Sequence, residues 1–256
     1  MLVRKFILAL SAFALLLSVN SCKKSVDPEE LEQVLGDLFP LTVGHKITFD
    51  GYMRDKTTNT NVDSTSAFYE ARMTVVSNST PTPVGGTSHL ISDSSKVHPA
   101  PVWVASGFYV RRATTTSGDF EFLTNIGLFL RTFGVTHGGA ASDTLKWVLL
   151  VKEGQFVLGE PWEAYDSTFA GASGAVRLRV EGQFTAREQL SLGGQTFNTY
   201  KLIATRKIYL GGSETASVSQ QTAALWLEPG LGIVRFIFDS DGEIPGFDRN
   251  YLTRNW

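Results

Sequence analysis

The stretch from 176 to 187 alternates apolar and polar residues over its whole length, reading Val-Arg-Leu-Arg-Val-Glu-Gly-Gln-Phe-Thr-Ala-Arg. Successive side chains of a β-strand point to opposite faces, so this alternation predicts a long strand with one buried and one solvated face. Residues 69–75 show the same pattern. Strands of this kind need partners along their edges, so the chain must form an extended antiparallel sheet.

Shorter segments with the same character occur along the rest of the chain, and many are separated by Gly-Gly or Asp-Gly pairs that suit hairpin turns. The predicted strands are 47–52, 108–113, 120–123, 145–151, 197–210, 223–227 and 232–238. We therefore expect an all-β fold of curved antiparallel sheets, half-barrel or sandwich-like, with one short helix near the N-terminus.

The two halves of this β region share a weak similarity. Each begins with a Val-Gly or Leu-Gly pair, continues through a strand with aromatic residues and a long alternating strand, and reaches a Gly-Gly turn. This order predicts a duplicated β unit, with a first half at 39–151 and a second at 152–256. One continuous domain over the same residues is the alternative.

The N-terminus has the pattern of an export signal. Arg4 and Lys5 precede an apolar run at 6–17, which is too short to cross a hydrocarbon core of about 30 Å as a helix. The segment Val19-Asn20-Ser21-Cys22 resembles the lipobox of bacterial lipoproteins. The resemblance implies that residues 1–21 form a signal peptide and that Cys22 becomes the lipidated first residue.

A tether and a short helix are expected between the lipidation site and the sheet, at 22–38. Asp27 can cap the first free amides of a helix, Pro28 suits its first turn, and Gly36 suits its end. Acyl chains on Cys22 would hold the protein almost permanently at a membrane. The expected location is the cell envelope, with the outer membrane preferred.

Charge and cysteine content exclude several classes of protein. The chain has 23 basic and 25 acidic residues, a net charge of −2, so it lacks the excess of basic residues typical of nucleic-acid binding. Cys22 is the single cysteine, which excludes an internal disulfide. The four histidines show no metal-binding spacing, and we expect neither a metal nor a cofactor.

The sequence contains no catalytic motif that we recognise. Gly-x-Ser-x-Gly, His-Glu-x-x-His and a phosphate-binding Gly-rich loop with its lysine do not occur. We therefore favour a non-enzymatic binding or structural role. The alternatives are an envelope hydrolase and a glycan-binding protein, in which Trp103, Trp147, Trp162 and Trp226 would stack on sugars instead of packing in the core.

Two further polar patterns each allow a binding interpretation. Asp239-Ser240-Asp241-Gly242-Glu243 could supply calcium ligands, but an ordinary hairpin turn explains the Asp-Gly pair equally well. Arg177, Arg179 and Arg187 are expected on one face of the long strand, where they could meet an anionic ligand. Glu181 shares that face, which favours a solvated outer surface.

The opposite face of the long strand is apolar, and it continues on the next strand across the turn at 193–194. Its residues are Val176, Leu178, Val180 and Phe184, then Tyr200 and Leu202. If the sheet closes or is covered, these residues form core, which we favour. If the sheet stays open, they line a groove for a lipid or another apolar ligand.

Two segments resemble a family of uncharacterised bacterial lipoproteins found especially in Bacteroidetes. The segment 39–49, Phe-Pro-Leu-Thr-Val-Gly-His-Lys-Ile-Thr-Phe, is similar to their FPLxxGxxWxY opening, with Ile47 and Phe49 in place of Trp and Tyr. The segment 226–235, Trp-Leu-Glu-Pro-Gly-Leu-Gly-Ile-Val-Arg, is similar to their WxxPGxGxV segment. The resemblance implies a mostly antiparallel β fold and no established activity.

Overall fold

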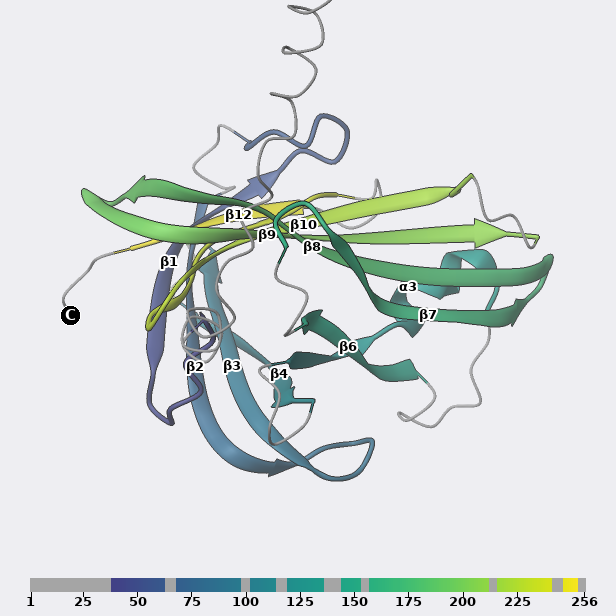
Figure 1. Cartoon of the computed structure of the whole chain (residues 1–256), viewed down its shortest axis with the longest axis horizontal. Helices are drawn as coiled ribbons and strands as arrows, with labels where there is room; N and C mark the ends of the chain where they lie inside the picture. The colour runs from purple at the N-terminus through teal and green to yellow at the C-terminus, as the bar shows by residue number, and fades with distance from the viewer. Residues whose placement is uncertain are drawn as a thin grey trace, which may run out of the picture.

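The computed structural model describes residues 38–62, 68–97, 102–113, 119–135, 144–152, 157–211, 216–240 and 246–252. These residues form one twelve-stranded antiparallel sheet that curls into a nearly closed, barrel-like body (Figure 1). The strands are β1 (Lys46–Arg54), β2 (Phe68–Pro81), β3 (Thr87–Val97), β4 (Val104–Arg112), β5 (Phe120–Asn125), β6 (Leu145–Val151), β7 (Pro161–Gly171), β8 (Gly174–Leu192), β9 (Gln195–Leu210), β10 (Ser219–Glu228), β11 (Gly232–Phe238) and β12 (Gly246–Tyr251).

The strand order follows the chain around the body. It runs β6-β5-β4-β3-β2-β1-β12-β11-β10-β9-β8-β7, so the first six strands and the last six meet where β1 pairs with β12. The all-β antiparallel fold class is therefore confirmed. The boundary between β6 and β7 coincides with the expected boundary between halves, but a duplicated unit stays a prediction.

Helices contribute little to the described residues. A single turn, α3 (Gly127–Leu130), continues into the 3-10 turn η2 (Arg131–Phe133) between β5 and β6, and neither was expected. The predicted helix within 22–38 and the lipidation site at Cys22 lie outside the described residues. Across the described ranges, no helix is long and apolar enough to cross a membrane.

The inward faces of the strands form the main core, as their alternation predicts. Phe49, Phe184 and Leu202 are fully buried there, and Phe39 closes over the core with its ring 5.4 Å from that of Phe122. A second cluster joins α3 to β8 and β9 through Leu130, Leu178 and Ile208. This cluster closes the body near α3.

A β-bulge lies between Phe184 and Ala186 in β8. After it, the residues that alternation would place on the outer face point to the inner face, and the reverse. Arg187 lies opposite Tyr200, a core residue, and its guanidinium is 5.4 Å from the Tyr200 ring centroid. The prediction that Arg187 shares the face of Arg177 and Arg179 is therefore wrong. Alternation alone cannot show a bulge, because the extra residue shifts the register without changing the pattern of residue types.

The edge strands β6 and β7 lie side by side, and no ladder pairs them among the residues described. A side chain bridges this seam: Trp162 Nε1 donates a hydrogen bond to the carbonyl oxygen of Leu149 at 3.1 Å. The indole lies over Gly182, its cross-strand partner, and an added Cβ on that glycine would meet the ring at 2.3 Å. Gly182 is thus the residue that lets Trp162 reach the seam.

Candidate ligand cavity

The interior of the sheet is not completely filled by side chains. A cavity of about 320 Å³ lies among the inward faces, and nearly all of its lining is apolar. Most strands contribute to its wall, together with α3 and the residue before it. The lining residues are Met73, Asp93, Phe108, Phe122, Thr124, Ile126, Phe129, Val148, Leu150, Leu178, Val180, Ala204, Arg206, Gln221, Ala223, Leu225, Ile233, Phe236 and Phe238.

The pairing of β8, β9 and β10 explains why the cavity is hollow, because inward residues of these strands lie in three successive rows. The rows are Val180–Arg206–Gln221, Gly182–Ala204–Ala223 and Phe184–Leu202–Leu225. The middle row holds only small side chains. It lies between the row with Arg206 and Gln221 and the row of large apolar side chains. Space therefore remains over Ala204 and Ala223.

The structure divides the predicted apolar face between cavity wall and packed core. Leu178 and Val180 line the cavity, while Phe184 and Leu202 belong to the main core. Tyr200 also packs in that core, and Val176 lies in the cluster beside α3.

The polar end of the cavity was not expected from the sequence. Arg206 is 7% exposed and Gln221 is 4% exposed, and they face each other across the β9–β10 pair. The Arg206 guanidinium lies 4.3 Å from the ring centroid of Phe129 in α3. A signal was present: Arg206 interrupts the apolar alternation of 200–208 at an inward position.

A second charged group on the cavity wall is bound within the protein. Asp93 accepts hydrogen bonds from Arg249 Nη1 at 2.8 and 3.0 Å, and Arg249 Nε donates to the Tyr69 hydroxyl at 3.2 Å. Burial raises the pKa of Tyr69. Burial alone would lower the pKa of Arg249, but the charges and hydrogen bonds of Asp93 and Tyr69 together outweigh it, so this pKa is raised. Arg249 therefore keeps its charge, which is balanced in the ion pair with Asp93.

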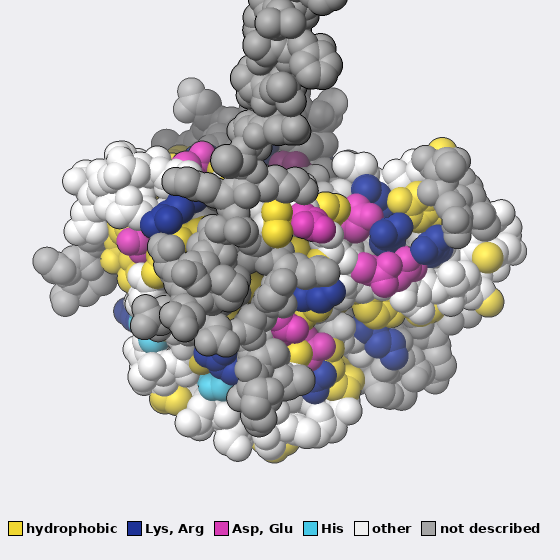
Figure 2. Space-filling model, in the orientation of Figure 1, with side chains coloured by type: hydrophobic (Ala, Val, Ile, Leu, Met, Phe, Trp, Pro, Cys, Tyr) yellow, Lys and Arg dark blue, Asp and Glu magenta, His cyan; other side chains and the backbone are white. Residues whose placement is uncertain are grey.

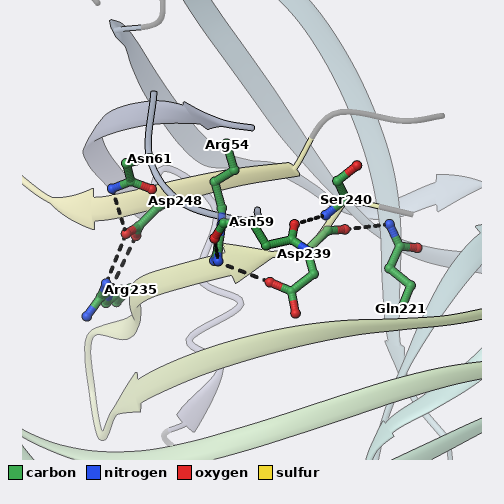
Figure 3. Close-up of polar contacts among 8 residues, drawn as sticks. All are labelled: Arg54, Asn59, Asn61, Gln221, Arg235, Asp239, Ser240 and Asp248. Atoms are coloured by element: carbon green, nitrogen blue, oxygen red, sulfur yellow. Dashed lines mark hydrogen bonds and ion pairs between the residues drawn. The ribbon is translucent and has the colours of Figure 1, made fainter. Parts of the chain in front are cut away.

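A polar network fastens the loop after β1 to the end of β11, beside the polar end of the cavity (Figure 3). Arg54 Nη1 lies 3.3 Å from Asp239 Oδ1, and Asn59 Oδ1 accepts from the Ser240 amide at 2.7 Å. Gln221 Nε2 donates to the Asp239 carbonyl oxygen at 2.7 Å. This network holds the Gln221 amide in place at the cavity wall.

The same network bears on the calcium interpretation of 239–243. The Asp239 carboxylate pairs with Arg54, and residues 241–243 lie outside the described part of the chain. No group of three or more His, Cys, Asp or Glu side chains arranged for a metal occurs among the residues that are described.

The predicted outer face of β8 forms ion pairs with its neighbours. Arg177 binds both oxygens of Asp166 at 2.8 and 2.6 Å, and Lys207 lies 2.6 Å from Glu181, which also contacts Arg179. The hydrogen bond from Arg177 lowers the pKa of Asp166. On the face shown in Figure 2, basic and acidic side chains lie next to one another. This mixture is typical of a solvated surface, as favoured for Arg177 and Arg179.

The rings of Trp103, Trp147, Trp162 and Trp226 are engaged within the protein. Arg72 lies 4.3 Å from the Trp103 ring centroid, and Arg111 lies 4.0 Å from that of Trp147. Trp162 is buried in the seam. Trp226 is buried on the outer side of β10, where its Nε1 donates to Glu188 of the β8–β9 hairpin at 2.5 Å. These contacts favour structural roles over sugar stacking.

The turn at Pro229-Gly230 in the second resemblance segment is structural. Gly230 has a φ of 77°, and the Leu231 amide donates to the Glu228 carbonyl oxygen at 3.1 Å, which confirms the predicted type II turn.

Two solved structures resemble this fold. One is a protein of Parabacteroides distasonis assigned as a lipoprotein, with 11% identity, a TM-score of 0.42, and coverage of 84% of this chain and 96% of its own. The other is a protein of Bacteroides fragilis assigned as an exported protein with a YmcC-like fold, with 13% identity, a TM-score of 0.45, and coverage of 83% and 96%. No protein-family model matches the chain, and no curated protein matches its sequence.

Proposed function

We propose that this chain is an envelope lipoprotein, anchored through an acylated Cys22, that holds one apolar ligand inside its barrel-like sheet without catalysing a reaction. The observation that carries the proposal is the interior cavity of about 320 Å³ with its apolar lining. Ligand sites in proteins are cavities of roughly this size, with apolar walls and a few placed polar groups. The anchor is supported by the lipobox resemblance.

A hydrolytic role receives less support from the cavity. Among its described lining residues, Asp93 is the one carboxylate, and both of its oxygens bind Arg249. Glycoside hydrolysis generally uses a pair of carboxylates across the bond that breaks.

The test uses the full chain with Cys22→Ser, so that no attached acyl chain competes, and the uncharged fluorophore N-phenylnaphthylamine. We expect saturable one-to-one binding. Ala223→Phe places a ring in the cavity and should abolish binding without lowering the melting temperature. Ala105→Phe, on an exposed position of β4, is the matched control and should bind normally. Equal binding by all three proteins would place the fluorophore elsewhere and refute the proposal.

A further inference from the structure

We infer that the ligand of the cavity is an amphiphile with a single anionic headgroup, a carboxylate or a phosphate monoester, and that Arg206 binds this headgroup. The inference rests on the proposed function and adds the chemical class of the ligand. It follows from how charge and polarity are distributed along the cavity.

The cavity is polar at one end and apolar at the other. Along β9 and β10 its wall passes from Arg206 and Gln221, through Ala204 and Ala223, to Leu225. These positions span four residues of strand, about 14 Å. A ligand lying along this wall therefore meets a cation and an amide at one end and aliphatic side chains at the other.

Both charged residues of the described lining have contacts within the protein, and Asp93 is bound by Arg249. Arg206 is buried, and its guanidinium carries five N–H donors and no acceptor, so besides its contacts within the protein it can donate to a ligand oxygen. The acceptors that form the strongest hydrogen bonds with a guanidinium are carboxylate and phosphate oxygens, so the favoured headgroup is an anion.

The surroundings of Arg206 strengthen such a contact. Phe129 covers the guanidinium at 4.3 Å, and Val180 lies opposite it on β8, so this end of the cavity excludes much of the water. Charge-assisted hydrogen bonds to a planar guanidinium are short and directional, and a low local dielectric strengthens them. Gln221, held by the Asp239 carbonyl, supplies a fixed amide beside the same position.

The experiment displaces N-phenylnaphthylamine from the full-length Cys22→Ser protein with dodecanoate, dodecyl phosphate or dodecanol, in buffer without detergent. These compounds share one chain and differ in the headgroup. One or both anions should displace the fluorophore at concentrations about 10- to 100-fold lower than the alcohol, as expected for a hydrogen bond to a charged group. The tighter anion identifies the source as carboxylate or phosphate.

Arg206→Gln should bring the three compounds to nearly equal affinity while the fluorophore still binds. Arg179→Gln is the matched control, because Arg179 lies on the solvated outer face of β8, where its Nε is 3.1 Å from Glu181. This variant should keep the preference for anions. Equal displacement by all three compounds in the unmodified protein, or a preference that survives Arg206→Gln, would overturn the inference.

A measurement on the unmodified cavity covers the case in which Arg206→Gln does not fold. The carboxyl carbon of ¹³C-labelled dodecanoate, followed by NMR, should titrate at lower pH when bound than in a neutral micelle. Titration at the micelle value would overturn the inference. Fluorophore binding without anion preference refutes the inference alone, whereas absence of any fluorophore binding refutes the proposed function and the inference together.

Discussion

Substituting Gly182 by alanine should open the seam between β6 and β7. An added Cβ would lie 2.3 Å from two ring carbons of Trp162 and 2.7 Å from its Nε1, far inside van der Waals contact. The indole is 3% exposed and cannot swing into solvent without leaving the core. It must shift, and its hydrogen bond to Leu149 is lost.

The expected loss of stability combines two effects. Overpacking of a core position costs about 1 to 3 kcal/mol, and the lost hydrogen bond costs about 1 kcal/mol, which gives about 2 to 4 kcal/mol. For a folded region of this size, the melting temperature should fall by about 4 to 16 °C. Urea unfolding followed by circular dichroism measures the free energy, and a thermal scan measures the midpoint.

Two controls isolate the clash. Gly107→Ala, also in a strand, adds a Cβ whose nearest neighbour is the flexible end of Leu90 at 3.2 Å, and it should cost much less. In a Trp162→Ala background the ring is absent, so Gly182→Ala should have almost no further effect. If Gly182→Ala destabilises the protein equally with and without the Trp162 ring, a clash with that ring is not the cause.

Two further predictions concern ion pairs. Asp93→Asn should lower the free energy of unfolding by about 3 to 5 kcal/mol, because it leaves Arg249 charged and buried. The double variant Asp93→Leu, Arg249→Met removes both charges, and urea unfolding should show that it recovers most of this loss. The lowered pKa of Asp166 predicts a contribution to stability that is present above about pH 4 and lost as the pH falls through the folded-state value. Urea midpoints measured from pH 6 to pH 2 should therefore decline less steeply in Asp166→Asn, and equal slopes would contradict this assignment.

Alternation of apolar and polar residues was sufficient to predict most of the sheet. It located β6 and β11 at the bounds they have in the structure, and it located parts of seven other strands. It missed β3, β7 and β12, and both β3 and β12 place polar residues on inward positions. Asp93 and Arg249 satisfy each other across the interior, and that pairing is a tertiary contact that no local pattern reveals.

The site was partly accessible from the sequence. The apolar face that includes Leu178 and Val180 was predicted from spacing. That this face is packed at Leu202 and hollow at Ala204 could not be predicted, because it depends on which residues the strand register places side by side. Arg206 was overlooked because an arginine in a strand usually marks the solvated face. Its position between Ala204 and Ile208 in the inward series was the available signal.

The most direct test of the ligand cavity is the titration of N-phenylnaphthylamine into the full chain with Cys22→Ser, compared with the same protein carrying Ala223→Phe. We expect one saturable site in the first protein and none in the second, and the melting temperature of the second should be equal or higher. Saturable binding that is unchanged when Ala223→Phe occupies the cavity, or no binding to either folded protein, would contradict it.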